Sequence, residues 1–155
     1  MSPDGSTLLF RALPAKHKFT PNDKRALNQF VRLLANRVAD GRAFTCLITT
    51  DKELQQLNQK FLGHDYPTDV LSFPALSVNG NLGEIAVSAE RAEAQAAEYG
   101  HNRLDEIRIL MLHGVLHLTG MDHESDRGEM AYAERKWRAE FDLPSNLIAR
   151  SARTR

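Results

Sequence analysis

The chain has 155 residues, a length that favours one domain spanning 1–155 with a sizeable hydrophobic core. Its 20 basic residues balance its 20 acidic residues, so net charge gives no overall attraction to nucleic acid or to an acidic membrane. The single cysteine excludes a disulfide within the chain, and no apolar run approaches the roughly 20 residues that span a bilayer, so we expect a cytoplasmic protein without a membrane partner.

Hydrophobic periodicity and capping signals predict nine elements in the order β-α-β-α-β-β-α-α-α. The expected strands are residues 7–13, 44–49, 69–74 and 83–87; the expected helices are 21–38, 51–62, 89–99, 103–118 and one that begins near residue 125 or 126 and ends before Pro144. This order predicts an α+β fold, in which a small mixed sheet of about four strands packs with helices around a buried central helix. The terminal segments 1–6 and 146–155 are expected to be mobile.

The central helix carries the chemistry. Its residues 107–118 are apolar on nearly every side, which is typical of a buried helix. His113 and His117 are four residues apart, so both imidazoles project from one face of this helix. Gly120 can adopt a left-handed conformation after the helix and reverse the chain, which would return His123 toward the other two rings.

A histidine in an apolar helix is most often a core residue with a hydrogen-bond partner. Two unpaired imidazoles buried in adjacent turns would each cost about 1–3 kcal/mol, and a shared divalent ion removes that cost. Three nitrogen ligands and an open position favour one catalytic Zn²⁺, although Ni²⁺, Co²⁺ and Mn²⁺ stay open. Candidate carboxylates that orient a ligand ring are Asp105, Asp122 and Glu124, each of which also fits an ordinary capping or surface role.

Such a site predicts hydrolysis, because zinc lowers the pKa of its bound water to about 7. The spacing of the three histidines is also that of the metzincin proteases, which carry a glutamate base directly after the first histidine. This chain has Gly114 there, and glycine cannot transfer a proton. The sequence therefore argues against a peptidase and identifies no catalytic residue beyond the metal-bound water.

Three blocks of the sequence resemble the YbeY family of bacterial metal-dependent endoribonucleases. Residues 113–123 resemble the family signature HGxLHLxGyDH, with Met121 in place of the usual aromatic residue. Residues 67–74 read PTDVLSFP, as in the family, and residues 82–85 resemble its LGDI, with Glu84 for aspartate. The likeness runs from about residue 54 to residue 137.

The resemblance implies a single-strand endoribonuclease that acts in ribosomal RNA maturation and ribosome quality control. It implies one zinc held by His113, His117 and His123, and association with ribosomal RNA and with proteins of the small ribosomal subunit. Asp69 and Ser72 belong to a block that surrounds the family's cleft, although either can equally have a structural role. A metallohydrolase with another substrate stays open as an alternative.

One position departs from the family. An arginine usually ends the N-x-x-(Y/F)-R pattern of the helix before the PTDV block, and this chain has Leu62 there. An arginine would bind a phosphate through two hydrogen bonds, which leucine cannot do. The sequence therefore leaves open a ribosome-associated metal-binding factor with weak or no catalysis. Candidate replacements for the missing cation are Lys60, His64, Arg103 and Arg108.

Overall fold

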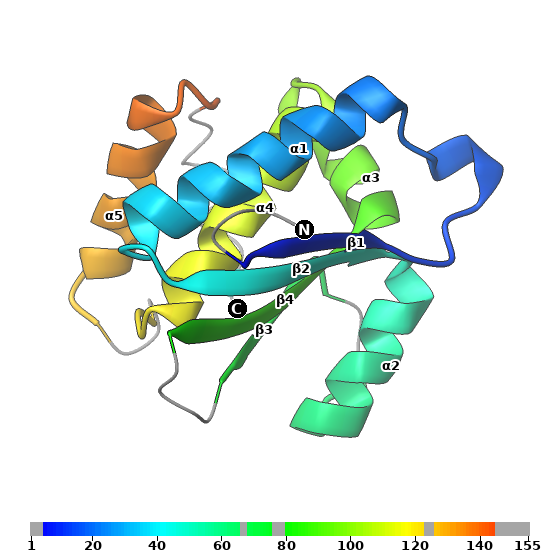
Figure 1. Ribbon diagram of the computed structural model, residues 1–155. Coiled ribbons are helices and arrows are strands. Elements are labelled where there is room, and N and C mark those ends of the chain that lie inside the picture. The colour runs from blue at the N-terminus through cyan, green and yellow to red at the C-terminus, as the bar shows by residue number, and fades with distance from the viewer. Residues whose placement is uncertain (1–4, 66–67, 76–79, 123–125, 145–155) are drawn as a thin grey trace.

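The computed structural model describes residues 5–65, 68–75, 80–122 and 126–144. Four strands form one mixed sheet with the spatial order β1-β2-β4-β3 (Figure 1). Strand β2 is parallel to both of its neighbours, β1 and β4, whereas β3 runs antiparallel to β4. The strands are β1 (Thr7–Phe10), β2 (Ala43–Thr49), β3 (Val70–Pro74) and β4 (Asn81–Ser88).

The helices cover the two faces of the sheet unequally. Helices α1, α3 and α4 lie on one face, α5 packs against α4, and α2 alone lies on the other face (Figure 1). Alternate residues of each strand serve different cores: Val70 faces α4, while Leu71 packs with Leu54 of α2. The helices are α1 (Pro21–Leu33), α2 (Asp51–Leu62), α3 (Ala89–Tyr99), α4 (Arg103–Leu118) and α5 (Glu129–Glu140).

This architecture confirms the expected α+β class and the expected order of elements, with shifted boundaries. Strand β1 ends at Phe10, three residues early, because the backbone takes a left-handed turn at Ala12, where φ is 60°. Strand β4 begins at Asn81 because its pairing with β2 starts there. Helix α5 begins at Glu129, since Asp126 accepts hydrogen bonds from the backbone N–H groups of Gly128 and Met130 before the helix starts.

The expected capping residues begin four of the helices. Thr20, Thr50, Ser88 and Asn102 each accept a hydrogen bond from a backbone N–H in the first turn of α1, α2, α3 and α4, respectively. Ser6, which falls in a segment expected to be mobile, is buried, and its Oγ accepts a hydrogen bond from the Phe44 N–H at 3.2 Å. Residues 1–4 and 145–155 lie outside the described part of the chain.

Helix α4 is the buried centre of the fold, as its apolar composition predicts. Ten of its 16 residues are buried, and it contacts β3, β4, α1, α3 and α5. It lies close to the sheet at Gly114, where an added Cβ would lie 3.0 Å from Ile85 Cγ2 and 3.3 Å from Ser72 Oγ. Within the described ranges, no helix is long and apolar enough to cross a membrane.

Candidate metal centre

His113 and His117 bring two imidazole nitrogens together at the C-terminal end of α4. Their Nε2 atoms lie 3.1 Å apart, and the ring centroids are separated by 4.7 Å. The pair follows from the helix itself, because residues four apart stack on one face. Both histidines are partly buried, and the side chain of His113 is 17% exposed.

The spacing of the two nitrogens suits a shared metal ion. Zinc–nitrogen bonds of about 2.0–2.1 Å in tetrahedral geometry place two ligand nitrogens roughly 3.3 Å apart. The separation of the His113 and His117 Nε2 atoms is within a few tenths of an ångström of that value. His123, the third expected ligand, lies outside the described residues, and no group of three potential metal ligands occurs among those that are described.

The chain reverses direction directly after the histidine pair. Gly120 adopts a left-handed conformation with φ of 104°, as its position after the helix predicts. Its N–H donates to the His117 carbonyl at 3.0 Å, and the Met121 N–H donates to the Leu116 carbonyl at 3.1 Å. The turn that would bring His123 back is therefore present up to Asp122, and the position of His123 itself stays a prediction.

Glu134 of α5 is a functional candidate that the sequence did not reveal. Its Oε1 lies 3.0 Å from His113 Nδ1, the ring nitrogen on the side away from His117. Histidines that bind metals commonly donate their second N–H to a carboxylate, which fixes the orientation of the ring. The sequence feature that could have indicated Glu134 is its place on the inner face of α5, one helical turn from the buried Met130 and next to the buried Ala133.

The carboxylates expected from the sequence are placed differently. Asp105 lies at the opposite end of α4, where its backbone N–H binds Asn102 and its carboxylate pairs with Arg108 at 2.9 Å. Asp122 is exposed, and its carbonyl accepts a hydrogen bond from the Asp126 N–H. Glu124 lies outside the described residues. Glu134 is thus the carboxylate that the described structure brings to a histidine of the pair.

Asp69 and Ser72 connect the sheet to its surroundings. The buried Asp69 accepts a hydrogen bond from the Ser88 N–H through its backbone carbonyl, at 3.0 Å. Ser72 donates its hydroxyl to the Gly114 carbonyl at 3.0 Å and so ties β3 to the residue beside His113. These contacts give both residues structural roles, Ser72 beside His113 and Asp69 where β3 and β4 meet, and a role in substrate binding stays a prediction.

Leu62 ends α2 with 44% of its surface exposed. Arg103 and Arg108, two of the candidate replacements for an arginine at this position, each interact with other groups. Arg103 donates to the carbonyls of His17 and Lys18 and stacks on the Phe19 ring, and Arg108 pairs with Asp105. The Lys60 Nζ lies 5.2 Å from the centroid of the Phe61 ring.

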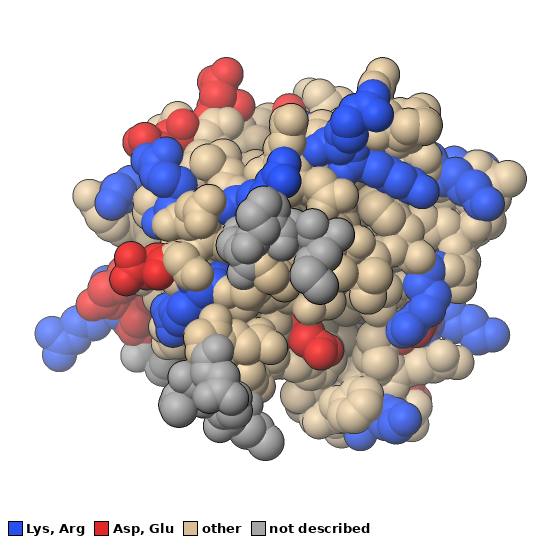
Figure 2. Space-filling model, in the orientation of Figure 1, with Lys and Arg blue, Asp and Glu red and all other residues tan. Residues whose placement is uncertain are grey.

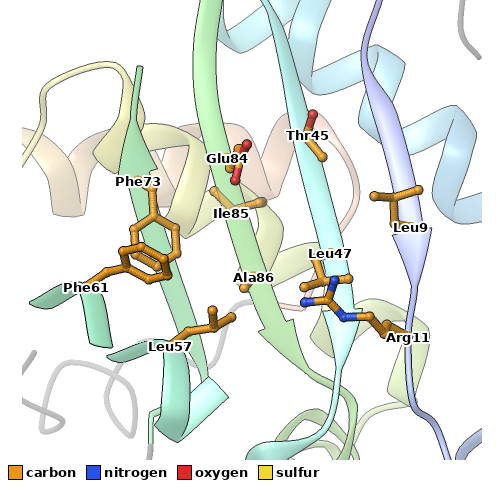
Figure 3. Close-up of a pocket in the computed structure, with 10 residues that line it drawn as sticks. All are labelled: Leu9, Arg11, Thr45, Leu47, Leu57, Phe61, Phe73, Glu84, Ile85 and Ala86. Carbon is orange, nitrogen blue, oxygen red and sulfur yellow. The ribbon is translucent and has the colours of Figure 1, made fainter. Parts of the chain in front are cut away.

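A separate groove of about 330 Å³ lies on the other face of the sheet, between α2 and the strands (Figure 3). Phe61 of α2 meets Phe73 of β3 edge to face, with ring centroids 5.9 Å apart. Arg11 and Glu84 add charge to its lining. Neither histidine of the pair lines this groove.

On the side of the molecule shown in Figure 2, basic side chains gather at the upper right and right of the view, while acidic side chains lie mainly at its upper left and left. The net charge of the chain is nevertheless zero. Electrostatic attraction of a polyanion depends on clustered positive charge, so it would be a local property of this surface and not of the whole chain.

Comparison with known proteins agrees with the sequence blocks. A family model described as Endoribonuclease YbeY matches residues 15–142. The chain is 52% identical to Endoribonuclease YbeY of Solibacter usitatus over 149 residues, covering 96% of this chain and 97% of the relative. It is 42% identical to Endoribonuclease YbeY of Nautilia profundicola over 130 residues, covering 83% and 90% of the two chains.

A solved structure shows the same fold. The solution structure of TM1509 from Thermotoga maritima aligns with a TM-score of 0.52 and 28% identity, covering 91% of this chain and 97% of that one. The family match extends beyond the histidine signature in both directions, from before α1 to the end of α5. With its fold, its paired histidines and these relatives, the chain belongs to the YbeY family.

Proposed function

We propose that this protein is a metal-dependent endoribonuclease that cleaves single-stranded RNA and takes part in ribosomal RNA maturation and ribosome quality control. Family membership supports the nuclease activity, since the relatives carry that name. The observation that carries the metal dependence is the pair of Nε2 atoms 3.1 Å apart, with a carboxylate behind one ring. RNA with unpaired bases and proteins of the small ribosomal subunit are the proposed partners, in the cytoplasm.

The proposed ligands are His113, His117 and His123, and the proposed ion is one Zn²⁺. When bound, a divalent ion supplies an activated water at neutral pH and positive charge beside a phosphodiester. The chain's own groups hold the ligand rings: α4 sets the spacing of the first two, Glu134 orients His113, and Gly120 turns the chain. Attack by water and attack by the ribose 2′-hydroxyl are both compatible with this arrangement.

Gly114 supports RNA over peptide as the substrate. A peptidase with this histidine spacing needs a glutamate at that position. The position is crowded, since a Cβ there would lie 3.0 Å from Ile85 Cγ2 and 3.3 Å from Val70 Cγ2. The absence of the glutamate, together with the close packing of α4 on the sheet, supports a substrate other than peptide.

The proposal is tested with a labelled single-stranded RNA and three samples: wild-type protein, wild-type protein treated with a chelator, and His117→Ala. We expect cleavage by the wild type alone, restored in the chelated sample by added zinc. Equal cleavage by all three samples would mean that a contaminating nuclease is responsible and would overturn the proposal. A matched duplex RNA shows whether unpaired bases are required.

Leu62 favours a second candidate function, a metal-binding ribosome-associated factor with little turnover. Its exposed position at the end of α2 lacks the guanidinium that would stabilise charge on a phosphate. Leu62→Arg distinguishes the two functions, with Leu62→Lys as a control that adds charge without the two-pronged geometry. If Leu62→Arg, but not Leu62→Lys, cleaves RNA much faster at unchanged RNA affinity, the wild type has a weakened active site. If neither the wild type nor the variants cleave RNA, the result supports the function as a binding factor.

A further inference from the structure

Helix α5 presents two charged side chains to the histidine pair, Glu134 and Arg138. Glu134 Oε1 lies 3.0 Å from His113 Nδ1 and 3.8 Å from Arg138 Nη2, so one carboxylate oxygen lies between a ring and a guanidinium. The His113 and Glu134 side chains are largely buried, and Arg138 is only 3% exposed. These contacts occur in the interior of the molecule, where charged groups are retained only with compensating partners.

The contact fixes which nitrogen of His113 carries the proton. An ionised carboxylate accepts hydrogen bonds and cannot donate them. His113 Nδ1 must therefore carry the hydrogen shared with Glu134, which leaves the lone pair on Nε2 of the neutral ring. That lone pair is on the nitrogen that lies 3.1 Å from His117 Nε2, the side on which a shared ion would bind.

Arg138 extends this arrangement by one helical turn. It follows Glu134 by four residues, the spacing at which an acidic and a basic side chain meet on a helix. A buried guanidinium 3.8 Å from the carboxylate favours its ionised form. Because α5 bears both groups and α4 bears the ring, the packing of α5 on α4 determines the orientation of His113.

We propose that Glu134 and Arg138 are positioning residues that hold His113 as its Nδ1–H tautomer and thereby raise the affinity of the site for a divalent ion. The inference rests on the metal site of the proposed function and adds two residues that do not bind the ion. Removing such an outer partner typically lowers metal affinity 10- to 100-fold.

The test compares Glu134→Gln and Arg138→Met with two controls on the same helix. Glu140→Gln and Arg135→Met make the same chemical changes at exposed positions. Zinc affinity is measured at one neutral pH by competition with a chromophoric chelator, and thermal melting of the metal-free proteins verifies folding. We expect affinity to fall about 10- to 100-fold in the two test variants and to stay within about twofold in the controls.

A second readout does not depend on metal or on activity. The ¹⁵N shifts of the imidazole nitrogens in the metal-free wild type report the tautomer of His113, and we expect Nδ1–H, shifting to a mixture in Glu134→Gln. Unchanged affinity in folded test variants, or an Nε2–H tautomer in the wild type, would overturn the inference. If Arg138→Met fails to fold, the zinc affinity of Glu134→Gln and the tautomer of His113 in the wild type still test the inference.

The two proposals fail in different ways. A wild type that binds no zinc would contradict the proposed function, whereas the tautomer measurement would still test the contact with Glu134. A wild type that binds zinc but cleaves no RNA would leave the positioning role standing, because neither of its readouts depends on turnover.

Discussion

Replacing Gly114 by alanine tests how closely α4 must approach the sheet. In an unconstrained helix the change stabilises by about 0.5–1 kcal/mol, since glycine loses more backbone entropy on folding. Here the new Cβ would lie 3.0 Å from Ile85 Cγ2 and 3.3 Å from both Ser72 Oγ and Val70 Cγ2. All three neighbours are side-chain atoms of β3 and β4, so relief requires these side chains, the helix or the sheet to shift.

The two effects oppose each other, and their sizes decide the sign. Overpacking a well-ordered core costs typically about 1–3 kcal/mol, which exceeds the helix-propensity gain. We therefore expect Gly114→Ala to lower the free energy of unfolding by about 1–2 kcal/mol. For a chain of this length that corresponds to a fall of about 2–8 °C in melting temperature.

The measurement is urea unfolding at 25 °C with thermal melting as a check. Ala94→Gly, at an exposed position in α3, is the matched control and measures the intrinsic propensity difference in this protein. In a double-mutant cycle, Gly114→Ala should cost less in a Val70→Ala background than in the wild type, because one of the three close contacts is then absent. A Gly114→Ala protein more stable than the wild type would refute the reasoning.

Two further predictions concern other parts of the chain. Hydrogen bonds from Arg11 and from the Thr49 hydroxyl hold the pKa of Glu53 below its usual range. The ionised carboxylate therefore stabilises the fold at pH values above the ordinary glutamate pKa. This contribution to stability is lost as the pH falls through the lowered pKa. The difference in unfolding free energy between the wild type and Glu53→Gln should therefore be largest at neutral pH and shrink toward pH 3 in a urea series; an equal difference at every pH would contradict this. Asn102 caps α4, because its side-chain oxygen accepts a hydrogen bond from the Asp105 N–H at 2.8 Å. Asn102→Ala should lower the free energy of unfolding by about 1 kcal/mol in the same assay. A loss below about 0.2 kcal/mol would show that the cap is dispensable.

Local signals predicted the elements because each depends on neighbours in sequence. Thr20 and Asn102 begin helices through hydrogen bonds within one turn, and Gly120 ends one through its own backbone conformation. Burial of α4 followed from the apolar residues on all of its sides. The strand order β1-β2-β4-β3 did not follow, since periodicity identifies which face of a strand is buried but not which strand lies beside it.

In the candidate site, too, features within one helix were predictable from the sequence, whereas contacts between elements were not. The pairing of His113 with His117 is a property of one helix and was predictable from a spacing of four. Glu134 reaches His113 only because α5 packs on α4, although the two residues are 21 positions apart in the chain, and no local pattern encodes that packing. The close approach at Gly114 likewise depends on the sheet, whereas the lack of a glutamate at this position is evident from the sequence itself.

The most direct test of the central claim is a zinc titration of the metal-free protein during cleavage of single-stranded RNA. The proposed ligand set of His113, His117 and His123 predicts that cleavage returns in proportion to added zinc, reaches a plateau at one ion per chain, and is absent throughout the same titration of His117→Ala. Undiminished cleavage by the metal-free wild type, or equal recovery in His117→Ala, would contradict the account.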